Sequence, residues 1–187
     1  MAEAVFVHSM DEHYEVVELH NTTEDAAAYA ASLVTAHQEY PGRLGYVTPT
    51  MERITKLLNL SNIVTFALRD RIGRVYGATS VQVDGEDAVL GNAFRLKEVQ
   101  GVGVGRRLIL HALGHAMTLG AQRVALEVMA DNPVRVLYGA MGFREYVVDD
   151  YLGLDERSDT VSMELCGRPA ITAAMDKLRA TLCASSE

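Results

Sequence analysis

The stretch Gln100-Gly-Val-Gly-Val-Gly105 lies between a predicted strand and a predicted helix, and it decides the fold. Its glycines let backbone N–H groups approach an anion closely, and the start of a helix adds partial positive charge. Pyrophosphate is the natural ligand of such a loop. The dinucleotide-binding pattern GxGxxG fails because Arg106 stands at its third glycine, and the P-loop pattern fails because Arg106 and Arg107 follow Gly105. A glycine-rich turn that binds nothing is the alternative interpretation.

The residues on either side of the loop predict an α/β (α+β) chain with a mixed, mostly antiparallel sheet of about seven strands flanked by helices. Turn residues at 70–73 and 84–87 separate three strand-like runs, which indicates an antiparallel meander before the loop. The predicted strands are 14–19, 63–68, 74–83, 88–96, 123–129, 143–148 and 160–166, and the predicted helices are 26–38, 50–60, 106–119, 132–141 and 168–182.

Composition narrows the classes of protein that this chain can be. Its 187 residues predict one domain, at about 150 residues per domain. There are 17 Lys and Arg against 25 Asp and Glu, and the net charge of −8 argues against a nucleic-acid partner. Two cysteines, Cys166 and Cys183, are too few for a disulfide framework. With no signal peptide at Met1 and no apolar run of about 20 residues, we expect a cytoplasmic protein that does not contact a membrane.

Three motifs in the right order resemble those of one enzyme family. The segment 100–105 matches the Q/R-x-x-G-x-G/A signature of the GCN5-related N-acetyltransferases, the GNAT superfamily. The run Leu126-Glu-Val128, followed by Asp131-Asn132 and 136–143, looks like the family's second motif, and 159–165 looks like its closing strand. The resemblance implies the GNAT fold, with its sheet splayed between the fourth and fifth strands. It also implies acetyl-CoA as co-substrate, with the pyrophosphate in the glycine loop.

Within this family, the sequence looks nearest to the ribosomal-protein alanine N-acetyltransferases, which modify protein N-termini. It also departs from them. Asp150-Tyr151 stands where that subfamily has paired tyrosines, 132–138 is one residue shorter than usual, and Lys97 replaces the usual proline. The resemblance therefore implies N-acetylation of a primary amine, on a protein N-terminus or on a small molecule. An acidic loop at 149–159 suits a cationic acceptor of either kind.

Two side chains are candidates for acid–base chemistry. Tyr138 is the candidate acid. The family resemblance implies that a tyrosine at this position donates a proton to the leaving thiolate. The alternative is a packing aromatic whose hydroxyl finds a surface partner. Glu127 is the candidate base, and strand alternation sends it to one face together with Ala125 and Met129. A solvated glutamate, or one paired for structure, is the alternative.

The remaining candidates would bind acetyl-CoA. The resemblance implies that a backbone N–H around Phe94 and Arg95 faces the oxyanion. Asn132 would bond the pantetheine arm, although it could equally be a helix N-cap, and Asp131 could take its place. Arg106 and Arg107 would neutralise phosphates unless they are ordinary surface residues. The full cofactor-binding set is Phe94, Arg95, Gln100, Gly101, Val102, Gly103, Val104, Gly105, Arg106 and Asn132.

Other interpretations remain beside this one. His111 and His115 are spaced for metal binding, but HExxH would need Glu where Ala112 stands, so we expect no metal. A CoA-binding regulatory module without catalysis is the alternative function. We expect an N-terminal extension at 1–13, an acetyltransferase domain at 14–166 and a helical tail at 167–187. The tail could cover the sheet edge or pair two subunits in a homodimer.

Overall fold

An antiparallel meander of three strands forms the middle of the sheet. A computed structural model describes residues 13–41, 50–146 and 160–184. The meander consists of β2 (Ile63–Asp70), β3 (Val75–Asp84) and β4 (Asp87–Arg95), close to the predicted runs. Gly73 and Gly85 have φ values of 89° and 59° in the connecting turns, a conformation that glycine adopts without steric cost.

Four further strands extend the meander on both sides. The sheet has seven strands in the order β1-β2-β3-β4-β5-β7-β6, and only β4 and β5 pair in parallel. This confirms the predicted mixed, mostly antiparallel sheet. The added strands are β1 (Tyr14–Leu19), β5 (Arg123–Met129), β6 (Arg144–Tyr146) and β7 (Thr160–Cys166).

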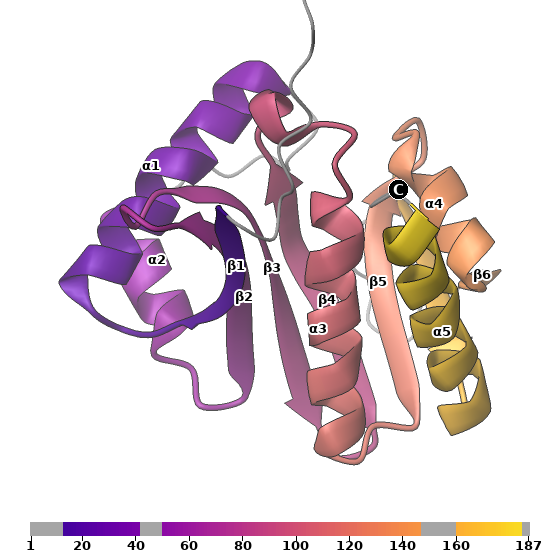
Figure 1. Ribbon diagram of the computed structural model, residues 1–187. Coiled ribbons are helices and arrows are strands. Elements are labelled where there is room, and N and C mark those ends of the chain that lie inside the picture. The colour runs from indigo at the N-terminus through magenta and orange to yellow at the C-terminus, as the bar shows by residue number, and fades with distance from the viewer. Residues whose placement is uncertain (1–12, 42–49, 147–159, 185–187) are drawn as a thin grey trace, which may run out of the picture.

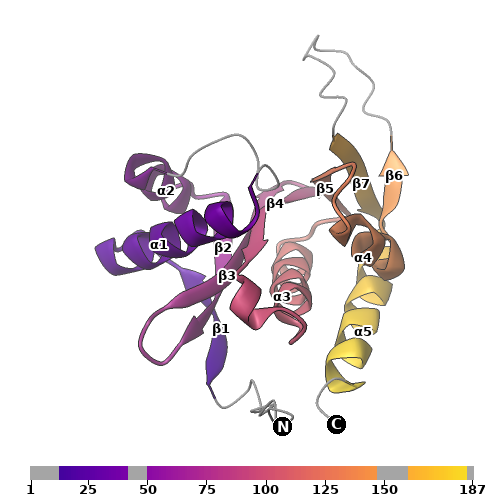
Figure 2. The ribbon, with the colours of Figure 1, turned by 90° about the horizontal axis from the view of Figure 1, so that it is seen from above.

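Helices cover both faces of the sheet. The helices α1 (Thr23–Glu39) and α2 (Met51–Leu58) lie on one face, and α3 (Val104–Thr118) and α5 (Arg168–Ala184) lie on the other (Figures 1 and 2). The short α4 (Val134–Met141) packs beside α5. None of the helices in the described ranges is long and apolar enough to cross a membrane.

Two buried clusters meet at α3. One joins β4, β5 and β7 to α3, α4 and α5, and it includes Leu90, Leu126 and Leu178. The other joins α1 and α2 to the first strands, and it also takes in Val104 and Leu108 from the start of α3. The first turn of α3 is therefore fixed by one cluster and the rest of the helix by the other.

The observed element boundaries differ from the predicted ones around the glycine loop. A short 3-10 helix, η2 (Lys97–Val99), precedes the loop and was not predicted. The helix α3 begins at Val104, inside the glycine run, because Gly103 serves as its N-cap with a φ of 82°. The predicted helix at 132–141 begins later, at Val134.

Candidate active site

The parallel strands β4 and β5 are joined for only part of their length. Asp87 to Leu90 pairs with Arg123 to Leu126, and beyond these residues the two strands separate. Past that point β4 stays paired with β3 as far as Arg95, and β5 with β7 as far as Met129. The predicted splay is therefore present, and it leaves an opening between the far halves of β4 and β5.

A β-bulge in β4 marks the point of separation. Asn92 and Ala93 together lie opposite the single residue Thr79 of β3. Asn92 has a φ of 51°, in the left-handed region that asparagine tolerates better than most residues with a side chain. The side-chain amide of Asn92 donates to the buried Ser80 hydroxyl at 3.4 Å. Because a bulge increases the local twist, it turns the rest of β4 away from β5.

The backbone of Arg95 faces the opening. The amide of Leu96 donates to the Tyr76 carbonyl of β3 at 2.8 Å, and successive amides along a strand point to opposite sides. The N–H of Arg95 therefore points away from β3, toward the side from which β5 has withdrawn. An N–H in this place can stabilise an oxyanion on a ligand in the opening. Of the two predicted residues, Phe94 and Arg95, the register favours Arg95.

The Arg95 side chain is held elsewhere. Its Nη1 donates to the Tyr40 hydroxyl at 2.9 Å, and its guanidinium carbon lies 5.7 Å from the centre of the Tyr40 ring. The ammonium of Lys97 lies over the same ring at 5.5 Å. The end of α1 thus fixes both basic side chains, and Arg95 offers the opening its backbone.

The glycine loop lies at the end of β4 and leads into α3. Gly101 and Gly103 have φ values of 89° and 82°, which residues with a β-carbon rarely adopt. A β-carbon on Gly101 or Gly105 would have no atom within 4 Å, so the space beside both residues is open. Gly103 provides no side-chain cap for α3, and the first N–H groups of a helix have no partner within the helix. The predicted anion-binding geometry fits this arrangement.

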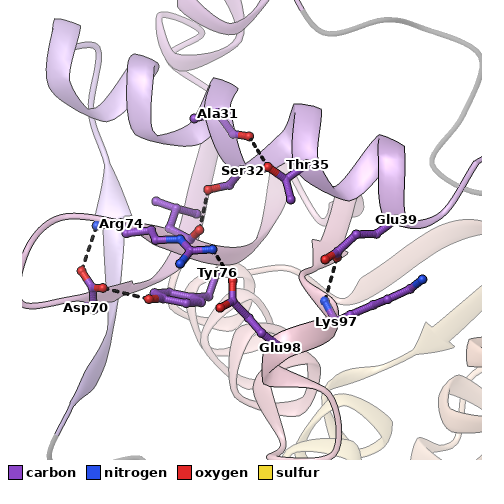
Figure 3. A network of polar contacts seen from close by, with 10 residues as sticks. Ala31, Ser32, Thr35, Glu39, Asp70, Arg74, Tyr76, Lys97 and Glu98 are labelled. Atoms are coloured by element: carbon purple, nitrogen blue, oxygen red, sulfur yellow. Dashed lines mark hydrogen bonds and ion pairs between the residues drawn. The ribbon is translucent and has the colours of Figure 1, made fainter.

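Contacts from distant parts of the chain anchor η2, which leads into the loop. The Lys97 amide donates to the Glu39 carboxylate at the end of α1, at 2.7 Å. Glu98 pairs with Arg74, the residue just before β3 (Figure 3). The approach to the glycine loop is therefore fixed by α1 and β3 together.

The other predicted loop residues differ in exposure. Val104 is buried and packs into the cluster under α1, so it holds the loop to the core. Gln100 and Val102 are exposed, and Arg106 is half-buried in the first turn of α3. Arg107 lies close enough to His111 that its charge, after burial, helps lower the pKa of that imidazole. A positive charge therefore stands near the start of α3, where a phosphate would be bound.

Tyr138 lies in α4, beside the open half of β5. It is 7% exposed and belongs to the same buried cluster as Val128 of β5. Its ring meets Phe143 edge-on, with 5.6 Å between the ring centres. Burial raises the pKa of Tyr138 to about 12, so the phenol keeps its proton over the whole neutral range. The burial and the Phe143 contact fit a packing aromatic, and the retained proton is what a donor to a thiolate needs.

Glu127 lies in β5 just beyond the last residue that pairs with β4. Val124, Leu126 and Val128 are buried under α3 and α5, so Glu127 projects from the opposite face, where it is exposed. Its cross-strand neighbour in β7 is Ser162. The carboxylate is therefore open to solvent on the face opposite α3, at the edge of the opening.

Comparison with known proteins identifies the family. The family model described as "Acetyltransferase (GNAT) family" matches residues 35–143, more than half of the chain. The chain belongs to the GNAT acetyltransferase family. The matched segment includes the glycine loop, the splayed strands, Glu127 and Tyr138. No protein with a curated description matches the sequence.

Solved structures share the GNAT fold. A ribosomal-protein-S18-alanine N-acetyltransferase from Escherichia coli is 24% identical, with a TM-score of 0.64 over 82% of this chain and 93% of the other. An acetyltransferase from Streptococcus agalactiae is 20% identical, with a TM-score of 0.66 over 81% and 96%. A GCN5-related N-acetyltransferase from Brucella melitensis is 18% identical, with a TM-score of 0.66 over 91% and 82%.

Asn132 lies just before α4, whose N-cap position is Pro133. Its Oδ1 accepts the Val134 amide at 3.1 Å, and its own amide donates to the Met129 carbonyl at 2.9 Å. The Asn132 side chain is therefore bonded to the first residue of α4 without occupying its N-cap position. Asn132 also lines an open hollow of about 680 Å³ on the outer side of α4, together with Arg135 and Glu145. That hollow does not contain Tyr138 or the glycine loop.

The histidine pair of α3 lies against an aromatic ring. The centres of the His111 and His115 rings are 6.0 Å and 5.7 Å from that of Phe66 in β2. Within 13–41, 50–146 and 160–184, no group of three or more His, Cys, Asp or Glu side chains could hold a metal ion. The expected acidic rim at 149–159 lies outside the described residues.

Sequence reasoning missed two features of the site. The bulge at Asn92 lies in a stretch that was interpreted as an uninterrupted strand. The contacts from Tyr40 to the end of β4 and from Glu39 to η2 join residues more than 50 positions apart. An asparagine inside an apolar strand pattern was the one available hint of the bulge.

Proposed function

We propose that this GNAT protein transfers an acetyl group from acetyl-CoA to a primary amine by direct attack within a ternary complex. The observation that carries the proposal is the opening beyond Leu90 and Leu126, with a backbone N–H of Arg95 that points away from β3 on one side and Glu127 at its other edge. Acetyl-CoA supplies an activated acetyl thioester. The residues around the opening bind it, polarise it and accept a proton.

The glycine loop is the part that would bind the pyrophosphate. The open space beside Gly101 and Gly105 and the uncapped start of α3 support this, because an anion can approach the N–H groups directly. Arg106, in the first turn of α3, adds a positive charge. The Arg95 amide would then donate to the thioester oxygen as negative charge develops there.

Glu127 and Tyr138 would serve the two ends of the reaction. The Glu127 carboxylate accepts the proton that the amine loses as its nitrogen bonds to the acetyl carbon, and passes it to solvent. The Tyr138 hydroxyl donates a hydrogen bond to the sulfur as the carbon–sulfur bond breaks. Since the pKa of Tyr138 is about 12, and an ordinary thiol titrates near about 8.5, the tyrosine stabilises the departing thiolate while keeping most of its own proton.

The acceptor is an amine on a protein N-terminus or on a small molecule. An α-amine with a pKa of about 7.7–8.0 is about a tenth neutral at pH 7, whereas a lysine near about 10.4 is almost wholly protonated. An exposed carboxylate such as Glu127 is a strong enough base to help deprotonate an α-amine, and it is less effective with a lysine side chain. The similarity to the Escherichia coli alanine N-acetyltransferase supports a protein N-terminus.

Release of the CoA thiol tests the proposal. Acetyl-CoA is incubated with peptides, polyamines, amino acids or aminoglycosides, and thiol is measured over time. We expect turnover with at least one of these classes and a fall in kcat/KM of about 100-fold for Glu127→Gln. Glu86→Gln, in the turn between β3 and β4, is the matched control and should be unchanged. Binding of CoA without thiol release in any class would instead favour a regulatory CoA-binding module.

A further inference from the structure

The helix α5 runs beside α3 in the opposite direction and ends at the glycine loop. Near its start, the Thr172 hydroxyl meets the Met117 sulfur at 4.0 Å. Further along, a β-carbon placed on Gly114 would lie 3.7 Å from Cε of Met175. Figure 1 shows the two helices side by side, with the end of α5 near the start of α3.

The last turn of α5 covers one glycine of the loop. A β-carbon on Gly103 would lie 3.0 Å from Cδ2 of Leu182, so the leucine methyl group is packed directly against the loop. By contrast, the space beside Gly101 and Gly105 is open. Leu182 therefore contacts the glycine that caps α3 and leaves the two others accessible.

The position of α5 is fixed by the core and by α4. Ile171, Ala174 and Leu178 are buried against α3 and the sheet. The Lys177 ammonium donates to the Ala140 carbonyl of α4 at 3.3 Å. Because these contacts hold the helix on two sides, Leu182 is presented to the loop by a rigid element.

We propose that Leu182 is a positioning residue for acetyl-CoA binding, acting through the conformation of Gly103. This proposal rests on the proposed function of the glycine loop. Glycines have the widest choice of backbone conformations, so a loop with three of them loses much entropy when it orders around an anion. A side chain that already confines Gly103 to its left-handed conformation removes part of that loss and strengthens binding.

The expected effect is on cofactor affinity and not on turnover. Leu182 lies at the loop, and the described contacts link it to neither Glu127 nor Arg95. We therefore expect Leu182→Ala to weaken CoA binding about five-fold while kcat at saturating acetyl-CoA stays within about two-fold. Leu182→Met, which keeps a side chain of similar volume, should restore most of the affinity.

Isothermal titration of CoA into each variant is the primary measurement. Leu119→Ala is the matched control, because Leu119 is an exposed leucine (55%) at the opposite end of α3. Its affinity should equal that of the wild type. Amide hydrogen exchange without ligand should be faster at 101–105 in Leu182→Ala and unchanged in Leu119→Ala.

A double-mutant cycle with Gly103→Ala tests the contact itself. The new methyl group meets the leucine and also imposes a strained φ of 82°, so Gly103→Ala alone should weaken binding strongly. If the contact operates, the double variant binds better than the sum of the single losses predicts. Equal CoA affinity and equal loop exchange in wild type and Leu182→Ala would overturn the inference. Failure of the wild type to bind CoA would overturn the proposed function of the glycine loop, and this inference would fall with it.

Discussion

The strands β4 and β5 are paired at one end of their junction and separated at the other, and the two ends have different roles. At the closed end, Asp87 to Leu90 pairs with Arg123 to Leu126, and Leu90 and Leu126 are buried in one cluster. At the open end, the strands separate past Leu90, next to the bulge at Asn92, where the Arg95 amide points away from β3 and the exposed Glu127 lies at the edge of the gap. Pairing gives the fold its stability, and its loss a few residues later gives the molecule room for a ligand.

An ion network reinforces the closed end. Arg123 of β5 donates to Glu164 of β7 at 2.5 Å and to Asp87 of β4 at 3.3 Å, so its guanidinium bridges three strands. It also lies 4.9 Å from the ring centre of Tyr146. We infer that this bridge limits how far the separation of β4 and β5 spreads. The comparison predicts that closed-end variants lose stability and that open-end variants lose activity.

The largest expected effect is on stability at the closed end. Leu126→Ala removes a side chain that is 3% exposed and should lower the free energy of unfolding by about 3 kcal/mol. Val89→Ala, at a β4 position that is 49% exposed, should cost less than about 1 kcal/mol. Urea denaturation measures both. Equal losses for the two variants would contradict the distinction between the buried and exposed faces of the junction.

At the open end, Tyr138→Phe should lower kcat about 100-fold with little change in CoA affinity or stability. In the proposed mechanism the phenol donates to the leaving sulfur, and it has no hydrogen bond among the described residues, so its removal should affect chemistry before stability. Because its pKa is about 12, the wild type should show no loss of activity from tyrosine ionisation below about pH 11. Steady-state kinetics across pH, with Tyr14→Phe as control, measure this. Unchanged kcat would remove Tyr138 from the reaction.

The bulge that separates the two ends has a smaller expected effect. Asn92→Ala places alanine at a φ of 51°, which asparagine tolerates better than alanine does, and removes the side-chain amide that donates to Ser80. We expect a loss of about 1 kcal/mol in unfolding free energy. Asn92→Gly adopts the same φ freely and should stay within about 0.5 kcal/mol of the wild type. If both variants are equally destabilised, backbone conformation at position 92 does not account for the loss of stability.

The smallest effect concerns acid sensitivity at the closed end. The hydrogen bond from Arg123 lowers the pKa of Glu164, so its folded carboxyl titrates below the usual 4.5. The stabilisation is present above the unfolded pKa and is lost as pH falls through the folded one. Glu164→Gln should therefore cost about 0.5 kcal/mol at pH 7, and this cost should shrink as the pH falls below the usual pKa of 4.5. Denaturation of Glu145→Gln, from the more exposed pair with Arg135, provides the control, and a pH-independent loss would contradict the assignment.

The features that the sequence predicts well are those with local signals. Turn residues at 70–73 and 84–87 mark the meander, and the glycines at 101–105 mark the loop before α3. Glu127 and its face follow from alternation of apolar residues along one strand. These signals depend on residues close together in the chain, where spacing and conformational preference act directly.

The features that were not predicted depend on distant contacts. Asn92 has a left-handed backbone conformation because the pairing of β4 with β3 requires it. Lys97 begins a 3-10 helix, and its backbone amide donates a hydrogen bond to the Glu39 carboxylate. The role of α5 at the loop depends on Leu182 reaching Gly103, which lies far away in the sequence. No periodicity of one segment reports such contacts, because their partners are set by the fold as a whole.

Residue-level amide hydrogen exchange with and without acetyl-CoA tests the central claim most directly. The account predicts slower exchange at Arg95 and at the loop amides 101–106 when the ligand is present. It also predicts no change at Leu90, because the closed end is already paired and buried. Slower exchange at Leu90 with none at Arg95, or no response at either residue, would contradict the claim that the open end of the β4–β5 junction is the acetyl-CoA site.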